Sequence, residues 1–95
     1  MVIERKKMEN NYCLSKHISW QMIDDSIVII DERTEKVKIL NESASDFWIT
    51  FIKFFNFNEA LLALSQKYSV TRNEIEEDFH QLLYMLVSNQ VLYEC

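Results

Sequence analysis

One stretch marks where the hydrophobic pattern of the chain changes: Leu40-Asn41-Glu42-Ser43-Ala44-Ser45-Asp46-Phe47-Trp48. Before it, apolar residues alternate with polar ones, as in a strand. After it, they recur every three or four residues, as on a helix. Asn41 or Ser43 can begin that helix by accepting a hydrogen bond from a free backbone N–H. Because Phe47 and Trp48 are too large to leave in water, the helical part must pack against the strands here.

The composition is that of one small packed domain with unusual turns. The 95 residues are 48% hydrophobic, which favours a packed core over disorder. There is no glycine and no proline, so glycine-rich phosphate loops are excluded. Turns must instead use asparagine, aspartate, serine and charged residues. The net charge of −5 disfavours nucleic acid and anionic membranes as partners.

The two cysteines, Cys13 and Cys95, lie near the two ends of the sequence. The first residues lack the apolar segment of a signal peptide. The longest apolar run, residues 47–55, is interrupted by Thr50 and Lys53 and cannot span a bilayer. We therefore expect a cytoplasmic protein whose two thiols are free.

The first half of the chain predicts a flexible N-terminal tail over residues 1–15, followed by a domain over residues 16–95. Short polar turns separate three candidate strands, near 18–22, 27–30 and 36–40, which predicts an antiparallel meander. In the third strand Val37 and Ile39 alternate with lysines, so we expect one buried apolar side and one wet side.

The second half predicts three helices, over about 42–55, 59–68 and 71–88, with Asn89 as the left-handed residue that ends the last one. The predicted fold class is therefore α+β: a three-stranded antiparallel sheet followed by a three-helix winged helix-turn-helix unit.

The winged layout suggests a DNA-binding regulator, but the charges oppose it. A DNA reader would place cations on the third helix. The first turns of that helix instead carry four acids, opposed by Arg72 alone: Glu74, Glu76, Glu77 and Asp78. Cys13 and His17 supply only two possible ligands, so no metal or cofactor is expected. No arrangement of nucleophile, base and oxyanion donors is apparent, so we expect no enzymatic activity.

The third strand is expected to lie at an edge of the sheet, with unpaired N–H and C=O groups. If the third helix lies beside it, the two enclose a groove that suits an incoming extended peptide. Lys36 and Lys38 could equally serve only to protect the edge against aggregation. The residues alone leave both interpretations open.

Three stretches of the sequence fit motifs that occur together in one protein family. Residues 28–48 resemble the signature LLD-x-RTG-x-x-x-x-LN-x-T-(G/A)-x-x-x-W, residues 68–70 the motif Y-x-V, and residues 75–86 the pattern V-x-x-D-V-x-x-(F/L)-L-x-x-L. In this order and spacing they resemble the PqqD-like proteins, which are the precursor-peptide recognition elements of ribosomal peptide natural-product pathways. Val91-Leu92 fits the closing G-L-L, so the resemblance spans about residues 16–93. Glu35 and Gln90 stand where the family has glycines.

The resemblance implies a non-catalytic adaptor without a cofactor. A precursor's leader peptide would add as a fourth antiparallel strand along residues 36–40, its apolar side chains against the third helix. The implied peptide-binding residues are Lys36, Val37, Lys38 and Ile39 on the strand and Ile75, Asp78, Phe79 and Leu82 on the helix. Asp78 would pair with a leader cation or a backbone amide. Glu76 and Leu83 replace Asp78 and Leu82 if the other flank of the helix faces the groove.

The implied partners are the leader peptide and a tailoring enzyme, with no nucleic acid and no membrane. The motifs look most like the stand-alone recognition protein of lasso-peptide pathways, which serves a leader peptidase. A PqqD-type chaperone for a radical SAM enzyme is the alternative, and a winged-helix DNA-binding regulator is a further one.

Overall fold

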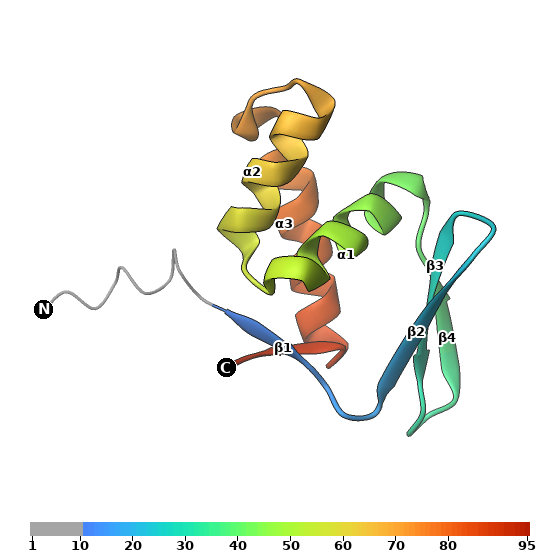
Figure 1. The fold of residues 1–95 in the computed structure, drawn as a ribbon. Coiled ribbons are helices and arrows are strands. Elements are labelled where there is room, and N and C mark those ends of the chain that lie inside the picture. Colours follow the sequence, from blue (N-terminus) through green and yellow to red (C-terminus); the bar gives the residue numbers. More distant parts are fainter. Residues whose placement is uncertain (1–10) are drawn as a thin grey trace, which may run out of the picture.

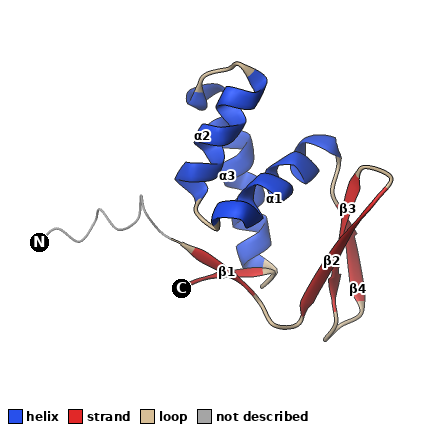
Figure 2. Ribbon diagram, in the orientation of Figure 1, coloured by secondary structure: helices blue, strands red, loops and turns tan. Residues whose placement is uncertain are grey.

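A three-stranded antiparallel sheet precedes three helices in the computed structural model, which describes residues 11–95 (Figure 1). The α+β fold class predicted from the sequence is thereby confirmed. The elements are β1 (Tyr12–Leu14), β2 (Ile18–Ile23), β3 (Ser26–Asp31), β4 (Lys36–Ile39), α1 (Glu42–Phe54), α2 (Phe57–Tyr68), α3 (Arg72–Ser88) and β5 (Leu92–Glu94). As Figure 2 shows, the β2-β3-β4 sheet stands to one side of the helices, and β1 and β5 form a separate pair.

The register of the sheet decides which side chains face the helices. Ile29 of β3 is opposite Trp20 of β2 and Lys38 of β4. Residues directly opposite each other in an antiparallel sheet share a face. Because Ile29 is buried in the core, the face it shares with Trp20 and Lys38 is the one toward the helices.

The junction between sheet and helices is made by the stretch at which the periodicity changes. Asn41 caps α1, its side chain accepting a hydrogen bond from the N–H of Ala44 at 2.8 Å. The hydroxyl of Ser45, 2% exposed, accepts a hydrogen bond from the N–H of Ile27 and donates one to the carbonyl of Leu40. This serine therefore continues the β3–β4 ladder into the first turn of α1.

The core lies between the helices and the inner face of the sheet. Phe47, Trp48 and Phe51 of α1 are fully buried. The ring of Phe47 stacks on Phe79 of α3 at 5.0 Å between centroids, and Trp48 meets Trp20 of β2 edge to face at 6.0 Å. Helix α1 thus joins α3 to the sheet, which fixes where α3 lies relative to β4.

The two ends of the described chain are fastened together, which corrects two predictions. Strand β1 pairs with β5, with Cys13 opposite Tyr93. A disulfide joins Cys13 to Cys95, whose Cα atoms are 6.0 Å apart, so the expectation of free thiols is wrong. The flexible tail predicted over residues 1–15 is also too long, because Tyr12–Leu14 form a strand. Residues 1–10, the rest of the predicted tail, lie outside the described residues. Spacing along the chain gave no sign that the ends meet.

Without glycine, polar and apolar residues alike adopt left-handed backbone conformations. Asp24 and Asp25, with φ of 50° and 68°, form the two-residue turn of the β2–β3 hairpin. Glu35 and Gln90, which replace the two glycines of the PqqD-like pattern, have φ of 64° and 63°. Asn89 has φ of −92°, so the prediction that it is the left-handed residue is wrong by one position.

Candidate functional site

Strand β4 has one free edge. It pairs with β3, and no other strand within residues 11–95 pairs with it. The N–H of Leu40 donates to the carbonyl of Ile27 at 2.9 Å, and hydrogen-bonded pairs alternate along an antiparallel ladder. The backbone groups of Lys36 and Lys38 therefore point toward β3. Those of Val37 and Ile39 point outward, where they can pair with another extended chain.

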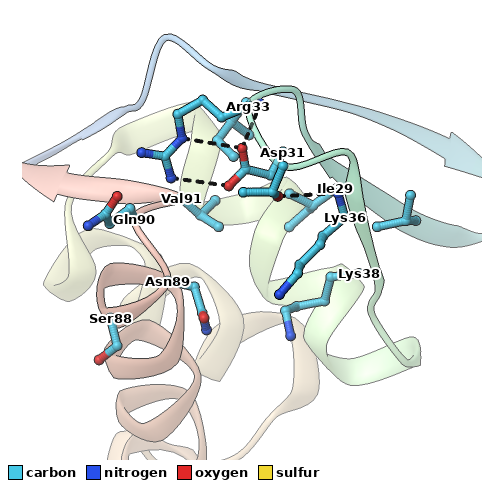
Figure 3. A pocket seen from close by; sticks show the side chains of 12 residues that line it. Ile29, Asp31, Arg33, Lys36, Lys38, Ser88, Asn89, Gln90 and Val91 are labelled. Carbon is cyan, nitrogen blue, oxygen red and sulfur yellow. Dashed lines mark hydrogen bonds and ion pairs between the residues drawn. The ribbon is translucent and has the colours of Figure 1, made fainter.

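A groove lies between this strand and the C-terminal end of α3 (Figure 3). Two buried isoleucines, Ile18 and Ile29, are among the residues that line it. Figure 3 shows Lys36 and Lys38 extending from β4 toward the end of α3, where Asn89 lies. The complete lining is Ile18, Ile29, Asp31, Arg33, Thr34, Lys36, Val37, Lys38, Ser88, Asn89, Gln90 and Val91.

The carboxylate in the groove, Asp31, is engaged by neighbouring residues. A guanidinium nitrogen of Arg33 lies 3.3 Å from it, and the backbone N–H of Arg33 donates to it at 3.0 Å. Nε2 of His17 is 3.9 Å away. The hydrogen bond from the Arg33 side chain lowers the pKa of Asp31, which is therefore ionised at neutral pH.

The lysines of β4 have no such partner. Asp31 is opposite Lys36 in the register, yet neither Lys36 nor Lys38 forms an ion pair within 4.0 Å in the described part of the chain. The strand wall of the groove is therefore positively charged.

The orientation of β4 is the reverse of the one predicted. All four residues of the strand are exposed, with Val37 at 58% and Ile39 at 68%. Val37 and Ile39 lie on the outer face of the sheet, while the lysines share the inner face with Ile29. The helices pack on the inner face of the sheet, and in the described part of the chain nothing buries Val37 and Ile39 on the outer face. The alternation of lysines with Val37 and Ile39 predicts that the strand has two different faces, but it does not predict which face the helices cover.

The residues predicted on α3 lie nearer its N-terminus than the groove lining does. Phe79 is 5% exposed and belongs to the core, Ile75 and Leu82 are half-buried against that core, and Asp78 is exposed. The groove is lined instead by Ser88 and Asn89 from the end of the helix. That the four predicted residues contact a peptide stays a prediction.

The spacing along α3 does relate two of these residues to the groove. Asp78, Leu82 and Met85 lie eleven, seven and four positions before Asn89, a spacing that places all of them on one side of a helix. The side-chain amide of Asn89 donates a hydrogen bond to the carbonyl of Met85 at 2.9 Å. Leu83, on the other flank, is 4% exposed and packed in the core. Asp78 and Leu82 therefore lie on the same side of α3 as Asn89, and that this flank contacts a peptide stays a prediction.

The sequence did not indicate the floor of the groove, or its far wall, which is the wall opposite β4 at the end of α3. Ile18 and Ile29 look like ordinary core residues in the sequence. The one available signal for the far wall was Gln90, which occupies a glycine position of the PqqD-like pattern. Its left-handed backbone turns the chain at the end of α3, so that Val91 also reaches the groove.

Within residues 11–95 no three His, Cys, Asp or Glu side chains are grouped so that they could hold a metal ion. In the same part of the chain, no helix has the length and apolar character needed to cross a membrane.

A free sheet edge beside a groove with a helix wall, on a sheet followed by three helices, is the arrangement that the resemblance to the PqqD-like proteins implies. The chain has the fold of the two solved structures described next, so the resemblance to the PqqD-like recognition elements is confirmed.

Among solved structures, the chain is similar to "TbiB1 in Complex with the TbiA(beta) Leader Peptide", with a TM-score of 0.75 and 25% identity over 83% of this chain and 92% of that one. It is also similar to "Lasso peptide synthetase B1 complexed with the leader peptide", with a TM-score of 0.75 and 23% identity over 86% of this chain and 96% of that one. No family model and no curated protein matches the sequence.

Proposed function

We propose that the chain binds the leader segment of a ribosomally made precursor peptide as a fourth strand along β4. The observation that carries this proposal is the outward-pointing backbone of Val37 and Ile39, next to a groove. Peptides that add to a sheet edge gain affinity from main-chain hydrogen bonds and specificity from pockets for alternate side chains. Both structural neighbours are complexes with a leader peptide, which supports the same occupant here.

The chain acts as an adaptor rather than an enzyme. It delivers the bound precursor to a tailoring enzyme, and the B1 neighbours favour the leader peptidase of a lasso-peptide pathway over a radical SAM enzyme. Holding the leader converts the encounter between core peptide and enzyme into an intramolecular event. Effective concentrations near millimolar are typical of short flexible linkers. In this proposal the adaptor works in the cytoplasm, where precursor peptides are made.

The test uses a proline on the free edge. Ile39→Pro removes an N–H that points away from β3, and proline is tolerated in edge strands when its nitrogen faces solvent. Ile39→Thr is the matched control, since it keeps both the N–H and the β-branched shape. The probe is the fluorescein-labelled leader of the precursor encoded beside this gene, titrated by fluorescence anisotropy.

We expect saturable binding that Ile39→Pro weakens at least about fivefold, because a main-chain hydrogen bond contributes about 1 kcal/mol. Ile39→Thr should bind within about twofold of the natural chain. Equal binding by the proline variant would exclude the β4 edge as the site. A mobility shift of upstream DNA at low salt, which the acids of α3 disfavour, would favour the regulator instead.

A further inference from the structure

We propose that the outer face of the β2-β3-β4 sheet, enlarged by the guest strand, is the surface on which the tailoring enzyme docks, using an uncharged apolar patch of its own. This inference rests on the proposed function and locates the second interface that an adaptor needs. The outer face is the one turned away from the helices (Figure 1), opposite the face that carries the buried isoleucines of the groove.

The outer face is apolar and carries no charge. The register of the three strands places these aliphatic residues on it: Ile23, Val28, Ile30, Val37 and Ile39. The other residues of the strands on this face are neutral: Ser19, Gln21 and Ser26. All charged residues of the three strands lie on the inner face: Asp31, Lys36 and Lys38. A face without charge, in a chain with 26% charged residues, has the composition of the centre of a protein interface, where charged residues are depleted.

The described chain leaves this face open. Ile23, Val37 and Ile39 are 47%, 58% and 68% exposed, and the aliphatic residues that β3 contributes are half-buried by their neighbours. The turn at one end of the face carries the exposed acids Asp24 and Asp25. Apolar patches with a polar rim mark places where another molecule binds.

The size of the face argues against a second copy of the chain as its occupant. Two strands of six residues and one of four, about 4.8 Å apart with about 3.3 Å per residue, present roughly 250–300 Å². Two copies packed face to face would therefore bury about 500–600 Å² in total, which is typical of crystal packing and below the roughly 1,000 Å² of a specific interface.

A guest strand enlarges the same face. A strand paired with β4 continues the alternation of the sheet, so every second guest side chain lies beside Val37 and Ile39. A protein docked on the outer face therefore contacts chain and guest together, over an area that is largest when a guest is bound. Because the enzyme must also act on the guest, it is the partner that such a shared face fits. In this arrangement the enzyme binds the loaded adaptor in preference to the empty one.

The test measures binding of the leader peptidase encoded beside this gene to the immobilised, oxidised full chain by biolayer interferometry, with and without saturating leader peptide. Val28→Lys places a cation in the middle of the outer face, between Gln21 and Ile39. Met22→Lys is the matched control, because it adds the same charge in the adjoining pair of the β2–β3 ladder, on the inner face, where Met22 is 49% exposed. Leader affinity is measured separately by anisotropy.

We expect the peptidase to bind the loaded chain at least about fivefold more tightly than the empty one. Since linked equilibria are reciprocal, the peptidase should tighten leader binding by the same factor. Val28→Lys should weaken peptidase binding at least tenfold and change the leader affinity of the isolated chain less than twofold, whereas Met22→Lys should change both less than twofold. If melting curves show that Val28→Lys does not fold, Val28→Thr, which keeps the β-branched shape, replaces it and should weaken peptidase binding at least about threefold.

The outcomes separate the two proposals. If the leader does not bind, or binds Ile39→Pro equally well, the proposed function fails. If the leader binds at the β4 edge but the peptidase does not bind, binds loaded and empty chains equally, or binds Val28→Lys as tightly as the natural chain, leader binding stands and docking on the outer face is refuted. A natural chain that sediments as a dimer, and as a monomer when it carries Val28→Lys, would show that a second copy covers this face and would also refute the inference.

Discussion

Removing the Cys13–Cys95 disulfide should cost this small domain much of its stability. The two cysteines are 82 residues apart in the sequence, so the cross-link closes nearly the whole chain into one loop. The loop-entropy relation gives about 4.5 kcal/mol for a loop of that size, an upper value because native strain and residual unfolded structure reduce it. A domain of this length has a total stability of roughly 5–14 kcal/mol. The cross-link therefore supplies a large share of it.

The assay is urea unfolding of the oxidised chain, of the same chain reduced with dithiothreitol, and of Cys13→Ser/Cys95→Ser. We expect the reduced chain and the double serine variant to agree with each other and to lie about 2–4.5 kcal/mol below the oxidised chain. Leader binding should change less than twofold while the domain stays folded, because the cysteines do not line the groove.

Two results would refute this reasoning. If native protein purified without reductant is alkylated at both cysteines, the disulfide does not form in solution and the expectation of free thiols was right. If the oxidised and reduced chains unfold at the same urea concentration, closing the long loop contributes nothing. Alkylation followed by mass measurement distinguishes the two cases before any unfolding experiment.

Three further predictions concern single residues. Gln90→Gly should stabilise the domain by about 0.5–1 kcal/mol in thermal unfolding, because glycine relieves a left-handed backbone at φ of 63°; the same change one residue earlier, where φ is −92°, should not stabilise. Ser45→Ala should destabilise by about 1–3 kcal/mol in urea, because it leaves the N–H of Ile27 buried and unpaired. Burial, helped by a hydrogen bond to Asp46, raises the pKa of Tyr68 to about 12 from 10.0. The unfolded chain therefore releases this proton first, and stability present below pH 10 should be lost as the pH rises toward 12; Tyr68→Phe should lack this loss, and an absorbance titration of tyrosinate reports the pKa directly.

The order of the elements could be predicted from the sequence because local patterns encode it. Alternation marks the strands, and the change of period at residues 40–48 marks where α1 begins. A cap at Asn41 or Ser43 and the burial of Phe47 and Trp48 followed from side-chain chemistry and size, and the structure places the cap at Asn41. Each of these features depends on residues that are close together in the chain.

What could not be predicted depends on which distant parts meet. Cys13 and Cys95 are neighbours only because β1 pairs with β5. The outward orientation of Val37 and Ile39 depends on which face of the sheet α1 and α3 pack against. The alternation of apolar and polar residues along the strand does not predict that face. For the same reason the stripe on α3 could be identified, but not the point along the helix at which Ser88 and Asn89 face β4.

The interpretation of the β4 lysines as edge protection follows from electrostatics. If two copies of the chain paired antiparallel through their free β4 edges, Lys36 and Lys38 of each would lie on one face of the joined sheet. Four neighbouring ammonium groups would oppose that pairing, as like charges do across strands. An edge with exposed Val37 and Ile39 can therefore remain unpaired, because its lysines disfavour a second copy of the chain.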